Sequence, residues 1–245
     1  AWSESVIESM LYVLWDLKLK IGHASRTVKE CLRLGKEDFT IRTAMLEHRH
    51  ICGDIQNAQN LEERLWSDLF SGTAHQFIDA KLREREARHI KQGGQRYVVE
   101  PNVKEGKGGL RDLHSLFWIA KYVHRVKTTS DLLELSLFSQ EEHKVFASAE
   151  RFLWAVRSHL HLITGRASDQ LTFDLQVQVA EIMGYNDHGS RPAVEMFMQD
   201  YFGHATKIGD LTRIFLTSLE ASHAKSEPLL QKILRRKPVV KADYM

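Results

Sequence analysis

The chain has 245 residues, of which 43% are hydrophobic and 27% charged, values typical of a folded globular protein. Its 34 lysines and arginines nearly balance its 32 aspartates and glutamates, so the formal net charge is only +2. This balance gives no overall argument for binding to nucleic acid or to a membrane surface, and any basic site must be local.

The two cysteines, Cys31 and Cys52, lack the spacing of a metal site or of a small disulfide scaffold. We therefore expect reduced thiols in a cytoplasmic protein. No apolar run reaches membrane-spanning length, and the first residues lack the pattern of a signal peptide. The sequence enters a helical pattern directly at Ala1, without a methionine, and we expect it to be part of a longer protein.

Helix and strand patterns alternate over the first 55 residues. Apolar residues recur at helical spacing over 3–17 and then alternate with polar ones over 18–24, as in a short strand. Thr27 stands where it can cap the helix that follows. Residues 38–52 predict a helix that passes into a short strand at 46–52. This alternation is typical of an α/β unit.

From residue 57 onward the pattern is almost entirely helical. Residues 57–92 contain no proline and carry one apolar stripe, which predicts one long helix or two, ended by Gly93 and Gly94. The segment RYVVE, 96–100, predicts a strand or an extended stretch. Further helices are predicted near 110–125, 140–165, 173–184, 191–222 and 226–235. The fold class is therefore mainly α: a helical bundle that follows a partial α/β unit.

The segment EPNVKEGKGGLRDLH, 100–114, concentrates glycine and positive charge just before a predicted helix. Its glycines and cations are Lys104, Gly106, Lys107, Gly108, Gly109 and Arg111. Successive N–H groups of such a turn, together with the N-terminus of the next helix, favour a bound anion. The segment thus suggests a phosphate or nucleotide site, although the Walker spacing is absent. A solvated turn, with Asp112 stabilising its own helix, explains the composition equally well.

Four segments resemble one enzyme family. The stretch EPNVKEGKGGLRDLHSLFWIA is similar to the signature of the bacterial bifunctional PII uridylyltransferase/uridylyl-removing enzymes. YVLWDLKLKIGHASRTVKECL, EDFTIRTAMLEHRHICGD and FLWAVRSHLHLITGRASDQLTFDLQVQVAEIMGY resemble the same family in order and spacing. The resemblance reaches to about residue 222. The adenylyltransferases that modify glutamine synthetase have a similar glycine-rich segment, but two of the other segments favour the uridylyl family.

The resemblance implies a domain organisation. Residues 1–55 would be the C-terminal remnant of a nucleotidyltransferase domain, 56–235 the helical domain after it, and 236–245 a linker. The family's D-x-D metal motif would precede Ala1, and no His-Asp dyad of the hydrolase type is present. We expect the parent protein to transfer UMP from UTP to a tyrosine of the nitrogen-regulatory protein PII with Mg²⁺, and this chain alone to be inactive.

A third metal-binding carboxylate is also implied by the resemblance. The best match is Glu47 within LEHRHICGD, with Asp54 as the runner-up. On a strand at 46–52, Glu47 and Arg49 would share one face. A carboxylate beside an arginine suits a metal–triphosphate site, and it suits a surface ion pair equally well.

The resemblance then assigns roles to the glycine-rich loop and to one later helix. Lys107 and Arg111 would be catalytic, because positive charge stabilises departing pyrophosphate. The residues expected to bind nucleotide are Lys104, Gly106, Gly108, Gly109, Arg157 and His161. Arg157 and His161 are four apart and share a helix face, which would meet nucleotide or PII, or simply water.

The remaining expectations concern structural roles. Asp112 would orient Arg111 or cap its helix, or the two would be buried partners at a domain interface. Asp169 has the place of a turn residue, and the tryptophans at apolar helical positions, Trp118 and Trp154 among them, are expected in the core.

Three alternatives to the uridylyltransferase remain open. A module could dock PII or nucleotide without turnover, an adenylyltransferase could act on glutamine synthetase, or the chain could be purely structural. A truncated sheet would also leave an exposed edge, and we expect a dimer through that edge if it is present.

Overall fold

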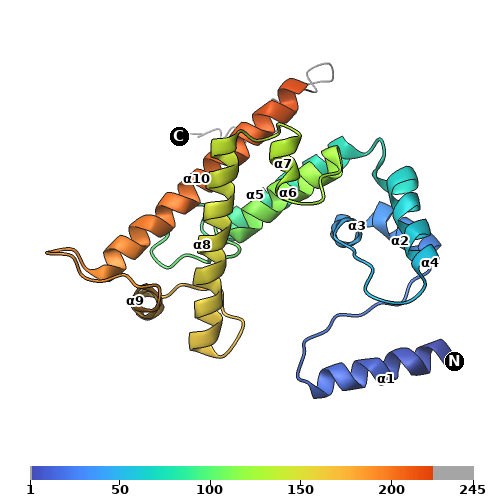
Figure 1. Cartoon of the computed structure of the whole chain (residues 1–245), viewed down its shortest axis with the longest axis horizontal. Helices are drawn as coiled ribbons and strands as arrows, with labels where there is room; N and C mark the ends of the chain where they lie inside the picture. Colours follow the sequence, from blue (N-terminus) through green and yellow to red (C-terminus); the bar gives the residue numbers. More distant parts are fainter. Residues whose placement is uncertain (1, 223–245) are drawn as a thin grey trace, which may run out of the picture. The chain divides into compact units, whose positions relative to one another are not determined.

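The structure is a computed structural model that describes residues 2–222, with side chains described for 5–219 (Figure 1). The helix predicted at 226–235 and the linker predicted at 236–245 lie outside the described residues. The described chain is mainly helical, so the predicted mainly-α class is confirmed. It separates into two compact units, Ala1–Ser71 and the residues from Gly72 onward. The division into parent-enzyme domains after residue 55 stays a prediction.

The first unit contains helices and one π-helical turn. These elements are α1 (Trp2–Asp16), α2 (Val28–Glu37), α3 (Phe39–Leu46), α4 (Ile55–Arg64) and η1 (Leu65–Phe70). Thr27 caps α2 as predicted, because its hydroxyl accepts the N–H of Glu30 while the Glu30 carboxylate accepts the N–H of Thr27. The elements from α2 to η1 pack together around Leu32, Leu46, Leu65 and Leu69.

The strands predicted in the first half of the chain are wrong. Residues 18–24 and 46–52 contain no strand, and of the two alternatives predicted for 96–100 the strand is not formed. α3 ends at Leu46, and Glu47 is its C-cap rather than part of a strand. A strand needs a partner to complete its hydrogen bonds, and within residues 2–222 pairing of this kind is confined to two isolated bridges, Asn102–Gln170 and His188–Arg191. The dimer expected through a sheet edge therefore loses its basis in the described chain.

The second unit is a bundle of helices. Its elements are α5 (Ala74–Lys91), α6 (Leu110–His124), α7 (Asp131–Glu134), α8 (Gln140–Thr164), α9 (Phe173–Ile182) and α10 (Ala193–Ser222). The long helix α10 packs on α6, α8 and α9, while α5 packs on α6 (Figure 1). The fully buried side chains include Phe77, Leu110, Phe146, Leu153, Leu160 and Phe197. None of the helices described here is long and apolar enough to cross a membrane.

Capping residues explain where the helices of this unit begin and end. The hydroxyl of Ser139 accepts the N–H of Glu142, and the Glu142 carboxylate accepts the N–H of Ser139, which fixes the start of α8. α8 ends at Thr164, and the positive φ of 63° at Gly165 is typical of a helix C-cap. α5 ends where Gly93 and Gly94 adopt φ angles of 88° and 70°, as the sequence predicted.

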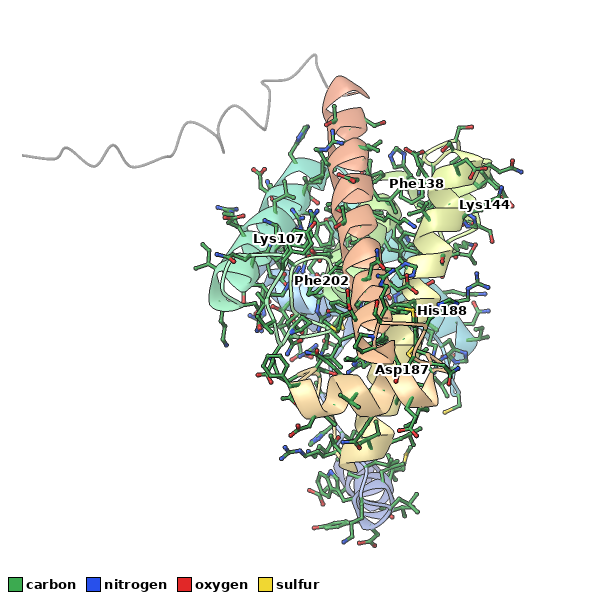
Figure 2. All side chains as sticks on the ribbon, turned by 90° about the vertical axis from the view of Figure 1, so that its left-hand side faces the viewer. Lys107, Phe138, Lys144, Asp187, His188 and Phe202 are labelled. Carbon is green, nitrogen blue, oxygen red and sulfur yellow. The ribbon has the colours of Figure 1, made fainter. Side chains whose placement is uncertain are left out.

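The glycine-rich loop needs its glycines for close packing. Gly108 has φ +80°, and a Cβ there would overlap the backbone of Ala205 on α10. A Cβ at Gly109 would lie 2.7 Å from the carbonyl oxygen of Val103, and one at Gly106 would lie 2.5 Å from that of Asn102. The loop is therefore folded tightly on itself and pressed against α10; Lys107 of the loop and Phe202 of α10 are labelled in Figure 2.

Replacing Gly108 tests this packing. We expect Gly108→Ala to lower the free energy of unfolding by about 2–4 kcal/mol, since it combines a left-handed backbone with overlap against a helix backbone. The control is Gly203→Ala on α10, where a Cβ meets nothing within 4 Å. Because alanine is the better helix former, the control should gain up to about 1 kcal/mol. Chemical denaturation measures both, and a Gly108→Ala protein as stable as the unchanged chain would contradict the packing.

Candidate functional site

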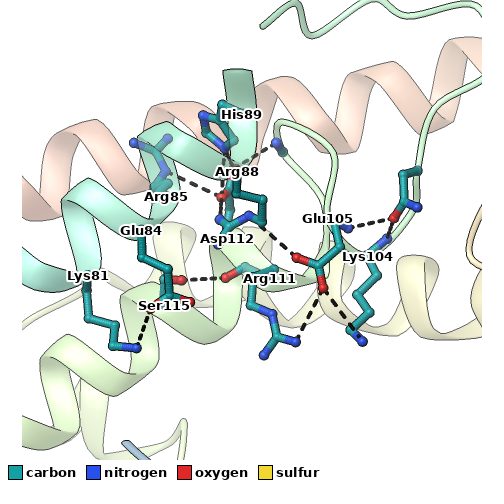
Figure 3. A network of polar contacts seen from close by, with 12 residues as sticks. Lys81, Glu84, Arg85, Arg88, His89, Lys104, Glu105, Arg111, Asp112 and Ser115 are labelled. Atoms are coloured by element: carbon teal, nitrogen blue, oxygen red, sulfur yellow. Dashed lines mark hydrogen bonds and ion pairs between the residues drawn. The ribbon is translucent and has the colours of Figure 1, made fainter. Parts of the chain in front are cut away.

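A buried carboxylate, Asp112, lies where the glycine-rich loop meets α5 and α6. Its side chain is fully buried. Oδ1 accepts a hydrogen bond from Arg88 Nη2 and lies 3.4 Å from Arg85 Nε. His89 Nε2 is 3.0 Å from both carboxylate oxygens, and the N–H of Gly108 donates to Oδ2 at 2.9 Å (Figure 3). One carboxylate thus joins the last turns of α5, the loop and the first turn of α6.

The surroundings of Asp112 keep it ionised. Burial by itself would raise the pKa of this carboxyl group, but the hydrogen bond from His89, the charges of Arg85 and His89 and the N–H of Gly108 outweigh it. Together they lower the pKa of Asp112 to about 2. Removing one partner of such a buried pair is strongly destabilising, because the other charge is left uncompensated. The network is therefore a structural anchor.

The expectation that Asp112 orients Arg111 is wrong. Neighbouring residues on a helix point in different directions, so the two side chains do not share a face. Arg111 Nη2 instead lies 3.3 Å from Glu105 Oε1, and its guanidinium lies over the Trp118 ring at 5.5 Å. Arg111 remains partly exposed (26%), whereas Asp112 is buried.

Glu105 gathers two of the predicted site residues. Its carboxylate lies 3.3 Å from Arg111 Nη2, 3.6 Å from Lys104 Nζ and 3.8 Å from Arg88 Nε. The side chain of Asn102 fixes this part of the loop, because its Oδ1 accepts the N–H groups of Lys104 and Glu105. Arg88 contacts both Asp112 and Glu105, so the buried network and this surface group are continuous (Figure 3).

Asp169 contacts two further predicted site residues, Arg157 and His161. Asp169 itself was not expected at the site from the sequence. Its Oδ1 accepts from Arg157 Nε at 2.7 Å and lies 3.0 Å from His161 Nε2. Burial tends to raise the pKa of Asp169, but the bonds to Arg157 and His161 and the charge of Lys104 lower it below its ordinary value. The N–H of Val103 donates to the carbonyl of Asp169, which ties the glycine-rich loop to the segment between α8 and α9. Asp169 is therefore more than the turn residue predicted from the sequence.

Two tryptophans complete a mixed surface on α6 and α8. Trp154 is 40% exposed, so its predicted place in the core is wrong. Arg157 lies over the Trp154 ring at 5.2 Å, and the His114 ring is 6.2 Å from Trp154 and 5.9 Å from Trp118. We call this surface the aromatic–basic face; its residues are Lys104, Arg111, His114, Trp118, Trp154, Arg157 and His161. The spacings 111–114–118 and 154–157–161, each one face of a helix, are the sequence signal for it.

The backbone of the loop does not form an open anion nest. The N–H groups of Gly106, Gly108 and Gly109 donate to Asn102 O, Asp112 Oδ2 and Gly106 O, each at 2.9 Å. Lys107 does not join the aromatic–basic face: it lines a small cavity with Lys91 and Arg96. The nucleotide-binding roles of these glycines and the catalytic role of Lys107 stay predictions.

The predicted metal ligand lies in the first unit. Glu47 is exposed at the C-cap of α3, and the strand on which it would share a face with Arg49 is not formed. Asp54, the runner-up, caps α4 by accepting the N–H of Gln56 at 2.9 Å. Within the described part of the chain, no group of three or more histidine, cysteine, aspartate or glutamate residues could hold a metal ion. The metal role of Glu47 stays a prediction.

Comparison with known proteins identifies similar chains. The family described as GlnD PII-uridylyltransferase matches residues 76–216. Proteins named bifunctional uridylyltransferase/uridylyl-removing enzyme are similar over almost the whole chain: 64% identical in Ruegeria pomeroyi (100% of this chain, 27% of that protein), 63% in Cereibacter sphaeroides (99% and 26%) and 55% in Caulobacter vibrioides (92% and 24%). The chain thus spans about a quarter of the length of these curated relatives. No solved structure matches.

The anchoring role of Asp112 predicts a large loss of stability in Asp112→Asn. We expect the free energy of unfolding at pH 7 to fall by about 3–5 kcal/mol, because Arg85 and Arg88 are left without their carboxylate. The control is Asp210→Asn, which removes an exposed carboxylate 3.8 Å from Arg213 and should change stability by less than about 0.5 kcal/mol. Urea denaturation measures both, and equal effects of the two substitutions would contradict the anchor.

The lowered pKa of Asp112 also predicts a pH dependence. The unfolded chain takes up the proton near the ordinary value of 3.8, and the folded chain only near pH 2. The contribution to stability is therefore complete above about pH 4 and is lost as the pH falls toward 2, with a size of about 2 kcal/mol. Unfolding curves between pH 5 and 2 measure it. Asp112→Asn should lack this component, and an unchanged acid dependence in that variant would count against it.

Proposed function

The chain belongs to the PII-uridylyltransferase family, and we propose that it is the part of a uridylyltransferase that helps to transfer UMP from UTP to a tyrosine of the nitrogen-regulatory protein PII. The match over residues 76–216 and identities of 63–64% to bifunctional uridylyltransferase/uridylyl-removing enzymes support this proposal. The names of these relatives also favour uridylyl transfer over an adenylyltransferase acting on glutamine synthetase. The proposal locates the reaction in the cytoplasm.

The aromatic–basic face is the observation that carries the proposal. A nucleoside triphosphate or its pyrophosphate product needs several positive charges, and a planar base or a tyrosine ring can stack on tryptophan. Lys104, Arg111 and Arg157 supply the charge, and their side chains are 30%, 26% and 18% exposed, so they remain accessible. Glu105 and Asp169 hold these cations in fixed positions without covering them.

The proposed role of these cations is to stabilise charge that develops as pyrophosphate leaves. Donors held in place before the reaction contribute most, because they need no rearrangement in the transition state. Mg²⁺ supplies further charge neutralisation when bound, and Glu47 is the proposed ligand from this chain. Since the described residues do not form a complete metal site, the remaining carboxylates must come from elsewhere in the parent protein. We therefore propose that this chain alone is inactive, and docking of PII without turnover is what it would retain.

Arg111 tests the role of the face. In the full-length protein, we expect Arg111→Ala to lower kcat/KM for uridylylation of PII about 100-fold, the size of effect seen when one such donor is removed. Stability should change by no more than about 1 kcal/mol, because the Arg111–Glu105 pair is partly exposed. Arg33→Ala removes an exposed arginine paired with Glu37 and is the matched control. If Arg111→Ala lost activity only in proportion to stability, Arg111 would be a packing residue.

The transfer itself is tested by the intact mass of PII after incubation with UTP and Mg²⁺. We expect the full-length protein to add the mass of UMP and the 245-residue chain to add none, because the described residues contain no group of three or more side chains that could hold a metal ion. ATP with glutamine synthetase is the parallel control. Absence of UMP on folded PII with both proteins would overturn the proposed function.

A further inference from the structure

A small cavity beside the glycine-rich loop is lined by three basic side chains that have no carboxylate partner. Its volume is 150 Å³, and its charged lining comes from Lys91 at the end of α5, Arg96 after it, and Lys107 of the loop, with Glu100. Within residues 2–222 none of the three cations forms an ion pair. This differs from the aromatic–basic face, where Glu105 and Asp169 hold the cations.

The carboxylate in the cavity wall is already engaged. Glu100 Oε1 accepts the N–H of Phe173 at 2.9 Å, at the start of α9. The backbone carbonyl of Glu100 accepts from the side-chain amide of Gln170 at 2.5 Å. Glu100 thus binds the start of α9 and the segment just before it. Because the cavity lining contains three cations and this one carboxylate, it keeps an excess of positive charge.

The Arg96 guanidinium packs against Gly209 of α10. A Cβ at Gly209 would overlap the Arg96 guanidinium, which keeps its present position only while residue 209 is glycine. Glycine inside a helix costs about 1 kcal/mol relative to alanine, and room for Arg96 explains its presence in the middle of α10. Arg96 Nε is buried and has no hydrogen-bond partner. An unsatisfied buried donor of this kind is unfavourable unless a ligand or water satisfies it.

Two other residues on the same face of α10 contact the loop or line the cavity. Tyr201, Ala205 and Gly209 are each four residues apart and so lie along one side of the helix. Ala205 receives the backbone of Gly108, which holds Lys107 in place, and Tyr201 lines the cavity. The Tyr201 side chain is only 3% exposed. Burial raises the pKa of Tyr201, so the phenol keeps its proton and remains a donor.

We propose that this cavity is a binding site for a small phosphate-type oxyanion, held by Arg96 and Lys107. The guanidinium fork and the lysine ammonium match the charge and geometry of phosphate oxygens. The volume of 150 Å³ is below the roughly 300–1,000 Å³ of pockets that enclose drug-sized ligands. A phosphate group therefore fits where a whole nucleotide does not. The site goes beyond the proposed transfer of UMP and does not depend on it.

Calorimetric titration of the full chain with inorganic phosphate, against chloride at equal ionic strength, tests the site. We expect saturable binding that Arg96→Ala and Lys107→Ala each weaken by about ten- to a hundredfold, the value of one charge-assisted hydrogen bond. Arg213→Ala, on the same helix and 72% exposed, is the matched control and should leave binding unchanged. Absence of saturable phosphate binding, or equal binding in all three variants, would overturn the proposal.

Gly209→Ala distinguishes a loss of the binding site from a loss of folding. It keeps every charge and improves the helix, yet displaces the Arg96 guanidinium. Weaker phosphate binding with an equal or higher melting temperature would support binding by Arg96 in its position beside Gly209. Unchanged phosphate binding would contradict it.

Pyrophosphate and UTP identify the source of the phosphate group. Competition by UTP at concentrations similar to those of phosphate assigns the site to nucleotide phosphates reaching in from outside. Competition by pyrophosphate alone assigns it to the free anion. Both results require the phosphate-binding cavity, whereas phosphate bound equally well in the presence of saturating pyrophosphate would exclude it.

Discussion

The second unit depends on one charge kept inside it. Asp112 is buried and ionised, and its partners come from α5 and from the backbone of the loop. Arg88 then connects Asp112 with Glu105, and Glu105 holds Lys104 and Arg111 at the surface. The positions of the exposed cations are in this way set from the core outward. A buried ion pair contributes little net stability compared with apolar packing, so its value here lies in fixing a geometry.

The glycine-rich loop divides its residues between two tasks. Its glycines serve packing, because their N–H groups and their missing side chains are used by the protein itself. Its charged residues point to two different places: Lys104 toward Glu105 and Asp169, and Lys107 toward the cavity with Arg96. A composition that suggested one phosphate-binding loop therefore belongs to a rigid turn that supports two separate basic sites.

The sequence predicted the helices well and the tertiary groupings poorly. Periodicity and glycine breaks predict α6 at 110–125 and α8 at 140–165, within a residue of their observed bounds. The strands failed because short alternating runs such as 18–24 also suit extended backbone without a partner. The side-chain partners of Asp112 on α5 are His89, Arg88 and Arg85, which lie 23, 24 and 27 residues away along the chain, and no local pattern reveals them. Lys104, Arg111, Arg157 and His161 were found by resemblance, but the carboxylates that group them were not.

The bonding of the loop also limits how the loop can change in evolution. Asn102, Val103 and Lys104 each supply an acceptor to an N–H several residues later, and Val103 is itself tied to Asp169. Inserting or deleting a single residue between 102 and 111 would shift every one of these pairs at once. Side chains such as those of Lys104, Lys107 and Arg111, which project from the turn, are free of that restriction. The number of residues in the loop is therefore constrained, whereas the side chains that project from it can be replaced. New specificities can arise here by substitution but not by insertion or deletion.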